Sequence, residues 1–235
     1  MNVDAKAVEV AVEKRRAGWP EIVAGAVVYT LSFYGGPPIV SAITHGSPAS
    51  SGIGLAVLSG VMGLLGFFAA FALRFRTWPA FSVRAIPARW IFISLGFGLL
   101  ALILNQATSI VYGLLSDGSG NNVQGDYQSA TQAGGPAFLL YLLGIAVLTP
   151  LGEEFLFRGV LATALTKYGS WVSVIGSTVV FALAHGINLA LIPAIIVGAI
   201  NGILLVRTKS VWPGVLVHAV NNGVGGILSL LVSGG

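Results

Sequence analysis

Long apolar segments separated by short polar stretches make up most of this chain. Seven of them are long enough to cross a bilayer as a helix. They cover roughly residues 21–43, 53–73, 90–114, 137–166, 171–187, 189–206 and 211–232. The pattern therefore predicts an all-α fold, namely a polytopic membrane helix bundle with about seven transmembrane helices.

The composition supports this class. Only 9% of the residues are charged and 55% are hydrophobic, whereas a soluble domain has about 25% charged residues. Residues 1–235 are predicted to form a single integral membrane domain. The chain has no Cys, which excludes a disulfide framework, a thiol nucleophile and a Cys-ligated metal.

Three local patterns refine this picture. Pro150 lies inside the fourth apolar segment and predicts a kink or a break there. Residues 1–16 alternate apolar and charged positions, which fits either a short interfacial helix or a cytoplasmic tail. Residues 116–135 are rich in Gly, Ser, Asn and Gln, so we expect a flexible external loop.

The basic residues predict the orientation of the chain. Every Lys and Arg except Arg158 falls on one side of the membrane if the N-terminus is cytoplasmic, whereas the opposite loops, 45–51 and 116–135, contain none. By the positive-inside rule, the N-terminus is predicted to be cytoplasmic and the C-terminus external. Because these residues lie at segment ends, the net charge of +4 does not indicate nucleic-acid binding.

The candidate chemistry lies inside the apolar segments. Glu153, Glu154 and Arg158 interrupt the fourth segment, and His185 and His218 lie in later ones. Ionisable groups at membrane depth are costly and usually mark a functional site. Counted at the helical rise, Glu153 and His185 both lie about 21 Å from the cytoplasmic end. His218 and Asn222 fall near the same level, so the sequence predicts one site.

The spacing of these residues suggests separate roles. Glu154 and Arg158 stand four residues apart, which predicts a buried ion pair that orients the site. Glu153 lies about 100° round the helix and is the candidate general base for a water molecule. His218 and Asn222 are also four residues apart and could donate two hydrogen bonds to one oxyanion. Each residue taken alone also fits a purely structural role.

Three motifs carry a resemblance to a known family: Glu153-Glu154-x-x-x-Arg158, Phe181-x-x-x-His185 and His218-x-x-x-Asn222. In order and spacing they resemble the signature motifs of the CPBP family, the intramembrane proteases of the CAAX-prenyl-protease and bacteriocin-processing (ABI) group. The resemblance covers residues 136–235, the expected catalytic core. The first three segments match only as generic membrane helices.

The resemblance implies proteolysis within the membrane. By similarity, Glu153 and His185 would activate water, His218 and Asn222 would stabilise the oxyanion, and Glu154 and Arg158 would hold the first motif. The family has been described both as metalloproteases and as metal-independent glutamate proteases. Zinc ligation by Glu153, His185 and His218 is possible, but the chain lacks the HExxH pattern. We favour direct water activation without a cofactor.

Two functions other than proteolysis stay open. A proton-coupled transporter could use Glu153, His185 and His218 as a relay, although the chain shows no inverted repeat. A non-catalytic membrane scaffold could bind a partner protein through the same fold. We expect a peptide or membrane-protein substrate, contact with the lipid bilayer and no nucleic-acid partner. The small size and the lack of targeting signals favour a prokaryotic plasma membrane, whereas the substrate's prenylation and the oligomeric state are left open.

Overall fold

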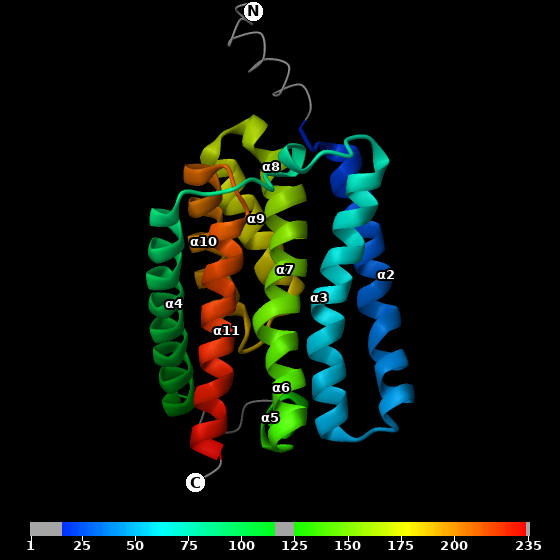
Figure 1. Ribbon diagram of the computed structural model, residues 1–235, viewed down its shortest axis with the longest axis vertical. Helices are drawn as coiled ribbons and strands as arrows, with labels where there is room; N and C mark the ends of the chain where they lie inside the picture. Colours follow the sequence, from blue (N-terminus) through cyan, green and yellow to red (C-terminus); the bar gives the residue numbers. More distant parts are fainter. Residues whose placement is uncertain (1–15, 116–124, 234–235) are drawn as a thin grey trace, which may run out of the picture.

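The computed structural model describes residues 16–115 and 125–233, which form an elongated bundle of helices without a strand (Figure 1). This confirms the predicted all-α class. Pieces of π-helix and 3-10 helix are marked η. In chain order the elements are α2 (Trp19–Thr44), α3 (Pro48–Leu73), η1 (Trp78–Phe81), α4 (Ala88–Leu115), α5 (Gly125–Gln132), α6 (Gly135–Leu143), η2 (Gly144–Leu148), α7 (Thr149–Glu153), η3 (Glu154–Ala162), α8 (Thr163–Leu165), η4 (Thr166–Tyr168), α9 (Ser170–Ala184), α10 (Leu191–Thr208) and α11 (Trp212–Ser233).

Six stretches of the described chain are helical, apolar and long enough to span a membrane, which agrees with an integral membrane protein. They are α2, α3, α4, the continuous helix of residues 135–168, α10 and α11. The seventh predicted segment is different. It forms α9, whose 15 residues extend about 22 Å and do not match a hydrocarbon core of about 30 Å.

The helix α9 ends early because its C-terminus is capped inside the bundle. Its last residue, Ala184, is followed by His185 and then by Gly186 at φ 82°, the left-handed conformation that commonly ends a helix. The chain turns there and returns as α10. Figure 1 shows this turn part of the way along the bundle rather than at its end.

The helix of residues 135–168, called the central helix below, changes its hydrogen-bond pattern on both sides of Pro150. The π-helical η2 ends just before α7, which contains Pro150, and the π-helical η3 follows it. Proline has no N–H to donate within a helix. The predicted interruption therefore takes the form of wide turns in a helix that continues. Such π turns are rare and often lie at functional sites.

Glycines bring α3 very close to the central helix. A Cβ atom added at Gly63 would overlap the backbone of Gly152, and one added at Gly60 would overlap the backbone of Leu148. Nearby, the Thr149 hydroxyl donates to the carbonyl of Ala56 at 3.1 Å. Small residues allow helix backbones to approach in this way within a membrane. These contacts fix the register of α3 against the part of the central helix that carries the charges.

The predicted flexible loop of residues 116–135 is partly wrong. Its second half forms α5, in which Ala130 and Thr131 are buried. Tyr127 and Ala130 pack in a small apolar cluster with Tyr141, so these side chains outweigh the polar composition of the segment. Residues 116–124 lie outside the described residues. So do residues 1–15, where we expected an interfacial helix or a tail.

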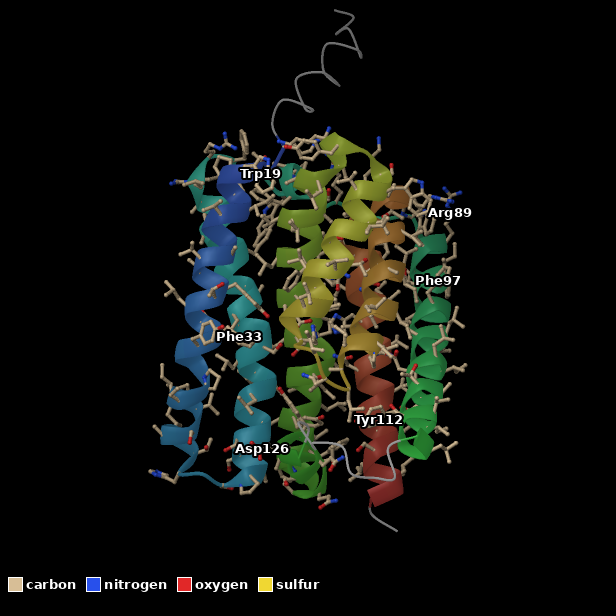
Figure 2. The ribbon with its side chains drawn as sticks, turned by 180° about the vertical axis from the view of Figure 1, so that it is seen from behind. Trp19, Phe33, Arg89, Phe97, Tyr112 and Asp126 are labelled. Carbon is tan, nitrogen blue, oxygen red and sulfur yellow. The ribbon has the colours of Figure 1, made fainter. Side chains whose placement is uncertain are left out.

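The two ends of the bundle differ in charge. Figure 2 places Arg89 at the same end as Trp19 and opposite Asp126. At the Arg89 end, Arg74 forms a two-bond contact with the buried Glu21, at 2.6 Å for each bond. The first described helix, α2, begins at one end of the bundle, and the last one, α11, finishes at the opposite end (Figure 1). Which end faces the cytoplasm stays a prediction from the positive-inside rule.

Candidate active site

The structure brings the central helix, α9 and α11 together around one group of buried polar side chains. Glu153 ends α7, and Glu154 and Arg158 lie in η3. His185 caps the C-terminus of α9, and His218 lies on α11. Of the four residues predicted to meet at one depth, Glu153, His185 and His218 lie together here, and Asn222 is bound elsewhere. The contacts within the group show what each side chain can do.

Glu153 presents one occupied and one free oxygen. Its Oε1 atom accepts a hydrogen bond from the Ser59 hydroxyl at 2.7 Å. Its Oε2 atom is buried and makes no hydrogen bond to any part of the chain that the structure describes. The Nε2 atoms of His185 and His218 lie 3.8 and 3.9 Å from Oε2. A carboxylate oxygen thus faces two imidazole nitrogens across gaps too long for a direct hydrogen bond.

The backbone orients the His185 ring. Its Nδ1 atom lies 2.9 Å from the carbonyl oxygen of Phe181. A carbonyl only accepts, so Nδ1 carries the hydrogen, and in the neutral ring Nε2 is left with a free lone pair towards Glu153. The Phe181 ring packs against the imidazole, with 4.6 Å between the ring centroids.

The predicted ion pair of Glu154 and Arg158 is also present. Nη1 of Arg158 donates to Oε1 of Glu154 at 3.1 Å, and both side chains are fully buried. Nη2 of Arg158 donates to the carbonyl of Gly198 on α10 at 3.1 Å. The guanidinium also lies 4.4 Å from the centre of the Phe181 ring, in a cation–π contact. Arg158 thereby joins three helices behind the site.

His218 lies between the two glutamates. Its Nδ1 atom is 3.3 Å from Oε1 of Glu154, while its Nε2 atom faces Glu153. A carboxylate paired with Arg158 is an acceptor, so Nδ1 of His218 donates to it. The sequence pointed to His218 as an oxyanion donor but did not indicate this second contact.

This buried group holds two carboxyl groups, Glu153 and Glu154, and one guanidinium, Arg158. Each of the two imidazoles beside Glu153 is able to carry a proton. Such a proton would compensate the second carboxylate, and an uncompensated buried charge costs several kcal/mol.

Asn222 is held through a chain of amides. Its Nδ2 donates to the carbonyl of Ile145 at 3.1 Å, and its Oδ1 accepts from Asn221 at 2.9 Å. Asn221 in turn accepts from Asn105 of α4 at 2.8 Å. One N–H of the Asn222 amide remains for a substrate. No polar contact between Asn222 and the Glu153 group is seen among the described residues.

The sequence did not reveal Ser59 or Asn221 as part of this arrangement. Ser59 lies in a segment that matched only as a generic membrane helix, and its partner Glu153 lies 94 positions away in the chain. Nothing in the pattern around Ser59 distinguishes it from other serines of the apolar segments. Asn221 precedes the predicted Asn222, but its partner Asn105 lies on a separate helix.

The imidazoles of His185 and His218 lie farther from Glu153 than two ligands of a tetrahedral zinc site lie from each other. Bonds of about 2.0–2.1 Å place two ligand atoms about 3.3 Å apart, whereas Glu153 and each imidazole are 3.8–3.9 Å apart. No group of three His, Cys, Asp or Glu side chains within residues 16–115 and 125–233 is arranged to hold a metal ion. In the described geometry, the two imidazoles would have to move closer to Glu153 before the three side chains could hold zinc.

Comparison with known proteins found one family model that matches the part of the chain containing this site. Residues 135–224 match the family model of Rce1-like type II CAAX prenyl endopeptidases, and this range includes all three motifs. The same comparisons found no matching curated protein and no matching solved structure. The Rce1-like domain confirms the resemblance to the CPBP family that the motifs indicated, and the family implies protease activity.

Proposed function

We propose that the protein is an intramembrane endopeptidase that uses Glu153 as the general base for a water molecule. The observation that carries this proposal is the buried Oε2 atom of Glu153, which makes no hydrogen bond to the described chain and faces Nε2 of both His185 and His218. In this mechanism His185 is neutral and His218 is protonated, so Oε2 of Glu153 and Nε2 of His185 accept hydrogen bonds there and Nε2 of His218 donates one. A water molecule between Glu153 and His185 can donate one hydrogen to each of them.

The first step forms a bond from the water oxygen to the scissile carbonyl carbon. Water donates one hydrogen to Oε2 of Glu153 and the other to Nε2 of His185, which orients a lone pair at the carbonyl. As the new bond forms, Glu153 takes the proton. A positioned base of this kind contributes about 10²–10⁴-fold in rate. Ser59 remains bonded to Oε1 and leaves Oε2 free for this transfer.

The second step breaks the bond between the carbonyl carbon and the amide nitrogen. The tetrahedral oxyanion receives hydrogen bonds from protonated His218 and from the remaining N–H of Asn222. Such donors typically contribute about 10²–10³-fold each. Glu153 then returns its proton to the leaving amine. Glu154, fixed by Arg158, keeps His218 in place through its Nδ1 contact.

A peptide whose Cys is farnesylated near the C-terminus is the first substrate to try. Purified protein in lipid nanodiscs would receive an internally quenched farnesylated CAAX peptide and its unprenylated counterpart. The proposal is supported if the wild type cleaves the peptide and the Glu153→Gln variant does not. Equal cleavage by both proteins contradicts the role of Glu153. Comparative membrane proteomics extends the test, because the absence of any Glu153-dependent new terminus would overturn the protease function and favour a scaffold.

Metal dependence is tested in the same assay. Activity that survives thorough EDTA treatment supports direct activation of water by Glu153. If activity disappears with the chelator and zinc restores it, the metal-free mechanism is wrong. Glu153, His185 and His218 would then have to move closer together than they are here.

A further inference from the structure

Ser59 of α3 donates a hydrogen bond to the proposed general base, although it lies outside the Rce1-like segment of residues 135–224. We infer that Ser59 is a positioning residue that keeps Oε2 of Glu153 turned towards the two histidines. This inference rests on the proposed function. It adds a residue from the N-terminal half of the chain to the catalytic arrangement.

The hydrogen bond of Ser59 decides which carboxylate oxygen is available. A carboxylate has two equivalent oxygens, and rotation would exchange them. The 2.7 Å bond from Ser59 engages Oε1 and leaves Oε2 in the gap that also faces His185 and His218. Hydrogen bonds to an ionised acceptor are about twice as strong as neutral ones. Without this bond, Glu153 could rotate away from the position in which it faces both imidazoles.

Three other serines in the apolar helices form a different kind of hydrogen bond from that of Ser59. Ser32, Ser94 and Ser109 each donate to a carbonyl four residues earlier in their own helix. That local bond is a common arrangement for a serine within a helix. The Ser59 hydroxyl instead reaches a carboxylate on a different helix. Its direction therefore follows from the position of Glu153 and not from a bond within α3.

Helix packing already holds α3 in place without this hydrogen bond. Gly60 and Gly63 press against the backbones of Leu148 and Gly152, and Ala56 accepts a bond from Thr149. These contacts lie on both sides of Ser59 in the chain. Loss of the Ser59 hydroxyl should therefore change the orientation of the Glu153 carboxylate more than it changes the fold.

Kinetics of three variants test the inference with the quenched farnesylated CAAX peptide in nanodiscs. Ser59→Ala should lower kcat by about 10- to 100-fold, as expected when a catalytic group is misplaced by about 1 Å. KM should stay the same, because Ser59 is not proposed to touch the substrate. Ser59→Thr keeps the hydroxyl and should restore most of kcat. Ser51→Ala is the matched control on α3, since its hydroxyl pairs only with Thr44 in the described contacts, and it should behave as the wild type.

Infrared spectroscopy provides a readout that does not need a substrate. The carbonyl band of protonated Glu153 is identified in acidified samples by its loss in Glu153→Gln. It should move to higher frequency in Ser59→Ala and stay in place in Ser59→Thr and Ser51→Ala. A band that does not move, or an unchanged kcat in Ser59→Ala, would overturn the inference. If the wild type cleaves nothing, the proposed function fails, and the infrared band alone decides the role of Ser59.

Discussion

Arg158 donates to Glu154 at 3.1 Å at the centre of the bundle, where neither side chain has any exposed surface. The pair also supports His218 through Glu154 and α10 through the carbonyl of Gly198. Removal of one partner leaves the other charge buried. Loss of one partner should therefore affect folding as well as catalysis.

Arg158→Ala should destabilise the protein by about 3–5 kcal/mol, the usual cost of breaking a buried pair. Thermal unfolding in detergent measures this loss. The exposed Arg76→Ala is the control and should unfold as the wild type does. The double variant Glu154→Leu with Arg158→Met should recover much of the stability, because no charge is left unpaired. It should not recover the activity. A stable and fully active Arg158→Ala protein would contradict the supporting role of the pair.

The amide chain that holds Asn222 predicts a graded loss of activity. Asn222→Ala should lower kcat by about 10²–10³-fold if its amide stabilises the oxyanion. Asn105→Ala should cost less, because Asn221 still binds the Asn222 side chain. Ser109→Ala on the same helix as Asn105 provides the control, since its hydroxyl bonds only within α4 in the described contacts. A larger loss of kcat in Asn105→Ala than in Asn222→Ala would show that the hydrogen-bonded amides do not act through Asn222.

The close approach of α3 to the central helix predicts that Gly63 tolerates no side chain. Gly63→Ala would force its Cβ into the backbone of Gly152, and overpacking of this kind typically costs about 1–3 kcal/mol. Gly35→Ala is the matched control, because nothing lies within 4 Å of a Cβ at that position. Thermal unfolding should separate the two variants. Equal stability of Gly63→Ala and Gly35→Ala would mean that α3 can shift without loss of stability. It would contradict the conclusion that helix packing alone holds Ser59 in place.

The orientation of the bundle can be tested by cysteine labelling, because the chain has no Cys of its own. Thr77→Cys lies at the basic end and Ser47→Cys at the opposite end, and both positions are exposed. In intact cells a membrane-impermeant reagent should label Ser47→Cys and should reach Thr77→Cys only after lysis. The reverse pattern would place the N-terminus outside and refute the orientation predicted from the basic residues.

The sequence predicted the helical class and the meeting of Glu153, His185 and His218, because charged groups in long apolar runs stand out and helical rise converts position into depth. It did not predict partners across helices. Hydropathy indicates that α3 is in the membrane but not which helix it contacts, so Ser59 was missed. The assumed rotation of 100° per residue also does not hold in η3, where the turns are π-helical.

The early end of α9 has a consequence for how the protein tolerates a helix terminus inside the membrane. Polar backbone groups in lipid must find partners within the protein. The turn supplies them itself, since Asn188 donates to the carbonyl of His185 and accepts from the N–H of Ala190, both at 2.8 Å. Ile187, on the same turn, is 86% exposed. The turn thus makes polar bonds within itself and presents an apolar outer surface, which suits a helix end that lies inside a bilayer.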